Sequence, residues 1–99
     1  MKYNEWLDEW LKFYVKPSRK HSTYLRYENL LRRHIRPKIG ELELNELSGR
    51  RLQKVVIELF ENGHAYRNRG LKASTISNII GVIHASLSQA VKSKLIDKQ

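Results

Sequence analysis

Hydrophobic residues recur at helical spacing in four separate stretches of this 99-residue chain. Apolar side chains three and four positions apart fall on one face of an α-helix, so each stretch predicts an amphipathic helix with one buried side. The four stripes are Trp6, Leu7, Trp10, Leu11 and Tyr14; Tyr24, Tyr27, Leu30, Leu31 and Ile35; Leu52, Val55, Val56, Leu59 and Phe60; and Ile76, Ile79, Ile80, Ile83, Leu87, Ala90 and Val91. We therefore predict an all-α bundle of four helices with short connections.

Serine, proline and glycine mark the expected ends of these helices. Ser22, Ser48 and Ser74 precede the last three stripes and are predicted N-caps, because a serine hydroxyl accepts a hydrogen bond from an unpaired N–H of the first turn. Proline disfavours helical geometry in the residue before it, and glycine commonly follows a helix. The predicted stops are Pro17, Pro37 with Gly40, Asn62 with Gly63, and Ser93.

Two connecting segments have distinct patterns. Residues 40–47 alternate leucine with polar residues like a strand, but the chain offers no second strand to pair with it. We predict an extended connector that buries Leu42 and Leu44. Residues 63–72 predict a polar loop, and Leu95 with Ile96 an apolar exit segment.

The composition is that of one folded domain. Hydrophobic residues make up 40% and charged residues 29%, which is enough apolar surface for a core. Cysteine is absent, which excludes disulfides and thiolate metal sites and favours a reducing compartment. No apolar run approaches the roughly 20 residues of a membrane span, and the first residues lack the apolar core of a signal peptide. We expect a cytoplasmic protein with no membrane partner.

The formal net charge of +9 predicts a polyanionic partner. The charge is unevenly spread: residues 16–40 carry eight Lys or Arg against one acidic residue, and residues 63–99 carry six against one. The two other segments are slightly acidic. This alternation favours a folded module with one nucleic-acid face over a uniformly basic tail.

Groups that would support catalysis do not converge in the sequence. The carboxylates cluster in two groups that look solvated, no glycine-rich phosphate loop is present, and no cationic cluster surrounds a tyrosine as a phosphoryl-transfer nucleophile would require. The histidines lack metal-ligand spacing, although His21 and His34 could donate to phosphate. We therefore predict no catalytic residue, metal site or cofactor. The four histidines are His21, His34, His64 and His84.

The beginning of the second predicted helix has the residues that a DNA contact needs. Cations and hydroxyls there adjoin the free N–H groups of a helix N-terminus, and two arginines follow seven residues apart on one face. A solvated basic face is the alternative interpretation. The predicted contacts in this segment are Lys20, His21, Ser22, Thr23, Arg26, Arg33 and Lys38.

The fourth predicted helix begins in the same way. The amide of Asn78 is suited to pair with adenine in the major groove. Further along, Gly81 and Ala85 are small residues for which we favour helix packing over DNA contact. The predicted contacts in this segment are Lys72, Ser74, Thr75, Ser77 and Asn78.

These landmarks resemble the SAM-like core-binding domain of tyrosine recombinases, as found in phage and conjugative-transposon integrases. Four pieces in the family's order and spacing carry the resemblance, and together they cover nearly the whole chain. They are Trp6-Leu7 through Trp10-Leu11; Ser22-Thr23 with Tyr27 and His34 to Gly40; Leu44 to Leu47 with Leu52-Gln53; and Leu71 to Ile76 with Leu87 to Val91.

The resemblance implies a bacterial or phage-encoded domain that forms half of a clamp around duplex DNA at a core recombination site, with its second and fourth helices on the DNA. It also implies that the catalytic residues lie in a following domain, expected beyond residue 99, so that this domain binds and does not cut. We expect it to be monomeric alone and its parent protein oligomeric on DNA. Ser48-Gly49 departs from the family's usual Thr-x cap, which puts the start of the third helix in doubt.

Two other functions are compatible with the same residues. A helical interaction module could use the basic face to bind an acidic partner protein. An RNA-binding domain would also need cations and hydroxyls on one face.

Overall fold

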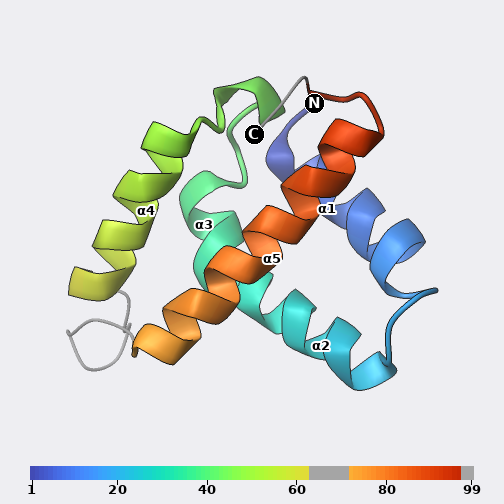
Figure 1. The fold of residues 1–99 in the computed structure, drawn as a ribbon, viewed down its shortest axis with the longest axis horizontal. Coiled ribbons are helices and arrows are strands. Elements are labelled where there is room, and N and C mark those ends of the chain that lie inside the picture. Colours follow the sequence, from blue (N-terminus) through green and yellow to red (C-terminus); the bar gives the residue numbers. More distant parts are fainter. Residues whose placement is uncertain (63–71, 97–99) are drawn as a thin grey trace.

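Four helices make up this fold, which is a computed structural model describing residues 1–62 and 72–96 (Figure 1). The first is α1 (Tyr3–Trp10) with its π-helical continuation η1 (Leu11–Val15), and the second runs through α2 (His21–Leu30), the π-helical η2 (Leu31–Ile35) and α3 (Arg36–Ile39). The others are α4 (Gly49–Asn62) and α5 (Ala73–Lys92). Within the described residues there is no strand, and the predicted all-α bundle of four helices is confirmed.

Helix α5 is the element around which the others pack. It runs diagonally across the front of the view in Figure 1, with α1 and the α2–α3 helix behind it and α4 at one side. It contacts α1, η2 and α4. The buried face of α5 supplies Ile76, Ile79, Ile83, Leu87 and Ala90 to the core.

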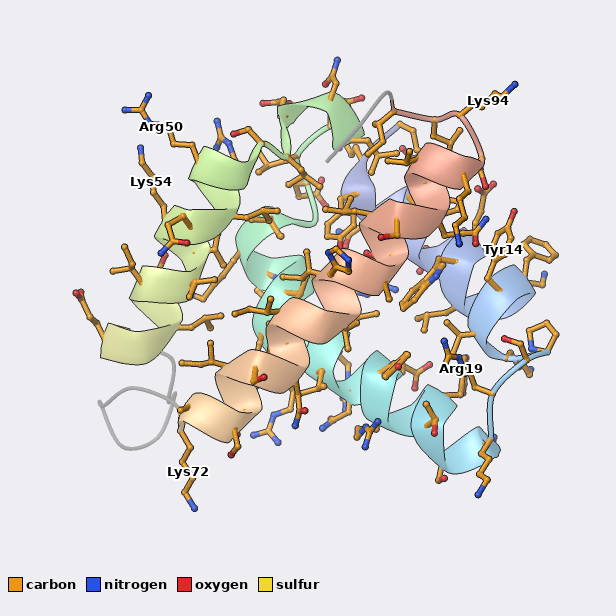
Figure 2. The ribbon with its side chains drawn as sticks, in the orientation of Figure 1. Tyr14, Arg19, Arg50, Lys54, Lys72 and Lys94 are labelled. Carbon is orange, nitrogen blue, oxygen red and sulfur yellow. The ribbon has the colours of Figure 1, made fainter. Side chains whose placement is uncertain are left out.

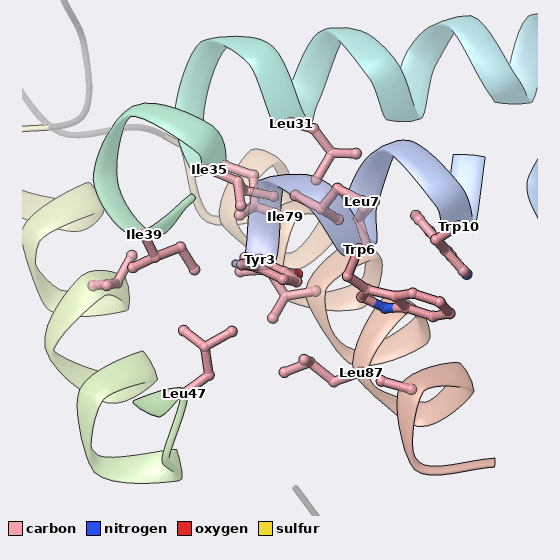
Figure 3. Packing of buried hydrophobic residues seen from close by; sticks show 14 of the residues in the cluster. Tyr3, Trp6, Leu7, Trp10, Leu31, Ile35, Ile39, Leu47, Ile79 and Leu87 are labelled. Atoms are coloured by element: carbon pink, nitrogen blue, oxygen red, sulfur yellow. The ribbon is translucent and has the colours of Figure 1, made fainter. Parts of the chain in front are cut away.

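The first helix and α5 supply most of the core, and the second helix adds residues from η2 and α3 (Figure 3). Trp6 and Leu7 of α1, and Leu31 and Ile35 of η2, are almost fully shielded from solvent. Each such side chain contributes about 1.5–3 kcal/mol when it leaves water. In the first predicted stripe every residue is buried except Tyr14, which is 40% exposed. In the second, only Leu31 and Ile35 are buried, and the preceding Tyr24, Tyr27 and Leu30 are partly buried against the core.

A buried hydrogen-bond network joins α1 to α5 at Ser86. The Ser86 hydroxyl donates to the carbonyl of Ile83 at 2.8 Å, so the Tyr3 hydroxyl donates to Ser86 Oγ at 2.7 Å. The Trp6 indole Nε1 donates to the Ser86 carbonyl at 2.8 Å. Burial raises the pKa of the Tyr3 hydroxyl, which keeps it a neutral donor.

The connector after α3 lies against the N-terminus. Tyr3 N donates to the Leu42 carbonyl at 2.8 Å, and Leu44 N donates to the Met1 carbonyl at 3.0 Å. The predicted burial is confirmed for Leu44, whereas Leu42 is only partly buried. The chain then tightens into a 3-10 turn, η3 (Leu44–Glu46), which the alternating pattern did not predict.

Glycine is required where the second helix meets α1. A Cβ atom at Gly40 would lie 2.2 Å from Asn4 Oδ1 and 2.6 Å from the Arg36 carbonyl oxygen. Gly40 follows α3 directly, as predicted. The prediction that Pro37 also closes the helix is wrong, because the π-helical η2 passes directly into α3 and Pro37 lies in the first turn of α3, where proline is tolerated.

Two of the three predicted N-caps are also wrong. Lys20 and Lys72 have extended backbones, and their carbonyls accept the first intrahelical bonds of α2 and α5. Ser22 and Ser74 therefore lie within the first turn and cannot cap it. The third prediction is confirmed, because Arg51 N donates to Ser48 Oγ at 3.2 Å at the start of α4.

Helix α5 buries a slightly different face from the predicted one. Ile80 is 42% exposed, whereas Val82 and Ser86 are buried, because α1 packs on the edge of α5 that carries these two residues. The predicted packing of Gly81 against a helix is wrong, since among the described residues no atom outside the local backbone of α5 lies within 4 Å of where its Cβ would be. Ala85 is partly buried against the core, as predicted.

A few predictions lie outside the described residues: the loop over residues 63–71 with His64, the helix stop at Gly63, and the burial of Phe60. In the part of the chain that is described, no helix has the length and apolar character needed to cross a bilayer.

Replacing Ser86 with alanine tests the α1–α5 network. S86A leaves the Tyr3 hydroxyl buried without its acceptor, so we expect the free energy of unfolding to fall by about 1–3 kcal/mol in urea denaturation. Y3F removes the hydroxyl while Ser86 keeps its bond to Ile83, and we expect about 1 kcal/mol or less. The double variant should regain part of the stability lost in S86A. Fully additive losses would contradict the network.

Candidate nucleic-acid interface

The start of α2 exposes cations and hydroxyls around unpaired backbone N–H groups. Lys20, His21 and Ser22 are exposed, and Thr23 is partly exposed. The first intrahelical bond of α2 is donated by Tyr24 N, so the N–H groups of His21, Ser22 and Thr23 have no partner within the helix. This geometry suits an anion such as phosphate.

His21 stacks on Tyr24, with ring centroids 6.2 Å apart. Partial burial raises the pKa of the Tyr24 hydroxyl, and the nearby Glu28 carboxylate adds to the effect, so this hydroxyl stays a neutral donor.

A polar face continues along the second helix. Ser22, Arg26, Asn29 and Arg33 follow one another at intervals of four, three and four residues, so they share the side of the helix opposite to buried Leu31. Arg26 packs its guanidinium 5.8 Å from the centroid of the Tyr27 ring. Asn29 was not among the predicted contacts, although its spacing from Arg26 could have identified it.

Some cations of the described chain are paired with a carboxylate, whereas others have no such partner and remain available to an outside anion. Among residues 1–62 and 72–96, no carboxylate lies within ion-pair distance of Lys20, Arg26 or Arg33. The ion pairs in that part of the chain are Met1 amine–Glu43 and Lys2–Glu41 at 2.9 Å, Arg36–Asp8 at 2.8 Å and Lys38–Glu58 at 2.6 Å.

Arg36 and Lys38 hold the bundle together. Arg36 Nη1 also donates to the carbonyl and the side-chain oxygen of Asn4, both at 3.3 Å, so it ties α3 to α1. Lys38 ties α3 to α4 through Glu58. Of the described cations predicted to contact DNA, Lys38 is therefore the one held in an ion pair within the fold.

The start of α5 presents small polar residues. Lys72, Ser74, Ser77 and Asn78 are exposed, and Thr75 is partly exposed. As in α2, the N-cap makes no side-chain hydrogen bond, which leaves the first backbone N–H groups accessible. Gly81 lies one turn further on the same face, and its lack of a side chain lets another surface approach the helix backbone.

The beginnings of α2 and α5 lie along one edge of the molecule. In Figure 1 both helices start at the lower edge, at its two ends, and Lys72 points away from the body there (Figure 2). Both starts are therefore found on the same side of the molecule in the view of Figure 1.

Residues that could ligate a metal do not gather in the described part of the chain. No group of three or more His, Cys, Asp or Glu side chains is placed there as a metal site would require. His34, considered above as a possible phosphate donor, is partly buried.

Comparison with protein families gives one match. The family described as phage integrase, N-terminal SAM-like domain matches residues 2–60. The matched region runs from the start of α1 into the last turn of α4, and so includes the basic start of α2 but not α5. No curated protein and no solved structure matches the chain.

Alanine variants of two arginines in the second helix test whether ion-paired cations stabilise the fold and unpaired ones do not. R36A removes hydrogen bonds from a side chain that is only 23% exposed, so we expect it to lower the free energy of unfolding by about 1–2 kcal/mol. R33A removes an exposed side chain, and we expect a change within about 0.5 kcal/mol. Urea denaturation of both variants measures this difference, and equal losses would show that this distinction between paired and unpaired cations is wrong.

Proposed function

The chain belongs to the phage integrase N-terminal SAM-like family, and from that premise we propose that it is the core-binding domain of a tyrosine recombinase. In this proposal it grips duplex DNA at the core recombination site during integration and excision. The matched region is the N-terminal part of such integrases, not the catalytic part. The catalytic domain of the same parent chain would complete the clamp on the other side of the DNA.

The observation that carries this proposal is the distribution of cations without carboxylate partners. The ion pairs of the described residues involve the N-terminus, α1, the connector, α3 and α4. Lys20, Arg26 and Arg33 have no such neutralising partner there, and they line the second helix from its start to η2. An unneutralised row of cations beside exposed hydroxyls matches the needs of a phosphate backbone.

The contacts divide by the chemistry of their side chains. Cations, hydroxyls and free backbone N–H groups at the two helix starts would bind phosphates and fix the position of the domain. Asn78, exposed one turn into α5, is the residue suited to a base edge, because its amide can both donate to and accept from adenine. The proposed contacts are Lys20, His21, Ser22, Thr23, Arg26, Arg33, Lys72, Ser74, Thr75, Ser77 and Asn78, with Lys38 adjoining.

Removing both unpaired arginines of the second helix is the principal test. R26A/R33A should weaken duplex binding by more than about tenfold and reduce the slope of log affinity against log salt by about 1.8, since each lost phosphate contact removes about 0.9. Fluorescence anisotropy with a labelled duplex at several salt concentrations measures both quantities.

A matched control removes the same charge elsewhere. Arg50 and Lys54 are exposed on α4, away from the lower edge (Figure 2), so R50A/K54A should retain most of the affinity. Equal losses for the two double variants would indicate binding through net charge alone. Competition by heparin as effective as by duplex at matched charge would instead favour an acidic protein partner.

Asn78 makes a separate prediction about specificity. N78A should leave the salt slope unchanged, because it removes no charge, but should narrow the difference in affinity between a cognate core site and a scrambled duplex. Loss of one bidentate base contact corresponds to about 1–3 kcal/mol of discrimination. An unchanged cognate-to-scrambled ratio would show that Asn78 does not contact a base.

A further inference from the structure

A groove separates the end of the first helix from the C-terminal half of α5. It has a volume of about 530 Å³ and is bounded on one side by η1 and the turn that follows, and on the other by residues Ala85 to Lys92 of α5. Its size lies within the range of roughly 300–1,000 Å³ that is typical of ligand sites. It is separate from the outward face of α2 that is proposed to bind duplex DNA.

Aromatic rings line the η1 side of this groove. Phe13 is 60% exposed and Tyr14 is 40% exposed, although both belong to a helix that otherwise buries its large apolar side chains. The Tyr14 ring packs against the Trp6 ring, with ring centroids 5.8 Å apart. Trp10 is held by a parallel stack on Tyr27, also at 5.8 Å. Phe13 and Tyr14 are therefore the rings exposed at this groove, whereas Trp10, which is only 4% exposed, belongs to the core and lines its wall.

Cations stand on both sides of these rings. Arg19 follows η1 and Lys92 ends α5, and both line the groove and are exposed. Figure 2 shows Arg19 and Tyr14 on the same side of α5. Among the described residues that line the groove there is no carboxylate. Gln89, which donates to Ser93 Oγ at 3.2 Å, adds an amide next to the rings.

We propose that this groove binds an unpaired nucleotide of single-stranded DNA. A base would stack on Phe13 or Tyr14, and the adjoining phosphates would contact Arg19 and Lys92. Aromatic platforms flanked by cations are the usual means of holding single strands without strong sequence preference. An acidic peptide would satisfy the same cations, but flat exposed rings and an amide favour a planar ligand with polar edges. The proposal does not depend on duplex binding by α2 and α5.

Tryptophan fluorescence of the 99-residue chain provides the test. Both tryptophans are buried, but Trp10 lines the groove and Trp6 does not, so an oligothymidylate of about six nucleotides bound against Phe13 or Tyr14 should cause saturable quenching through Trp10. F13A and R19A/K92A should each weaken this binding by about fivefold or more. F13L, which keeps an apolar side chain but loses the ring, should behave like F13A.

Two controls separate this site from the duplex site. I57A removes a side chain of similar exposure on α4 and should bind the single strand normally. R26A/R33A should also bind it normally while losing duplex affinity. Circular dichroism of every variant verifies the helical fold.

Several outcomes would overturn the proposal. These are the absence of quenching, equal binding by F13A and the parent chain, and loss of single-strand binding in R26A/R33A. Tighter binding of an oligouridylate or of free thymidine monophosphate would reject single-stranded DNA as the ligand. Tighter binding of a glutamate-rich peptide containing phenylalanine, dependent on Phe13 and Arg19, would assign the groove to a protein partner.

Discussion

The crossing of α1 and α5 at Ser86 is the contact on which the arrangement of the helices depends. Tyr3 and Trp6, on successive turns of α1, both bind Ser86. Tyr3 contacts the serine hydroxyl, and Trp6 donates to the serine carbonyl. This fixes both the rotation of α1 and its position along α5. Because η1 continues α1 and contacts α2, the start of the second helix is positioned relative to α5 through the same crossing. A hydrogen-bonded buried site sets this geometry more uniquely than apolar packing alone.

The ion pairs then determine which cations on the surface are free to bind an anionic partner. Carboxylates of α1, the connector and α4 neutralise cations that join one element to another, and these pairs hold the N-terminus and α3 in place. Glu41 illustrates the effect, because its hydrogen bond with Lys2 lowers the pKa of its carboxyl. The second helix lacks such partners along its outward face. Lys20, Arg26 and Arg33 are therefore left without a neutralising carboxylate among the described residues, as a polyanionic partner would require.

Features that depend on local spacing were predictable from the sequence, and features that depend on contacts between helices were not. The 3.6-residue period located all four helices, and Ser48 was a correct cap. The predicted N-caps at Ser22 and Ser74 each lie two residues after the observed ones, because the extended residue before each helix is a lysine that uses no side-chain cap. Pro37 lies in the first turn of α3, which continues directly from a π-helical turn that no sequence rule predicts. Charge predicted the basic segments, but only the structure showed that Glu58 engages Lys38.

The most direct measurement of the central claim is the perturbation of backbone amide chemical shifts when duplex DNA is added to the isotopically labelled domain. The account predicts that shifts concentrate at the beginnings of both α2 and α5, from Lys20 to Thr23 and from Lys72 to Asn78, while Arg50 to Lys54 of α4 remain unchanged. Shifts confined to one of the two beginnings, or centred on α4, would contradict a single DNA-binding edge formed by both helices.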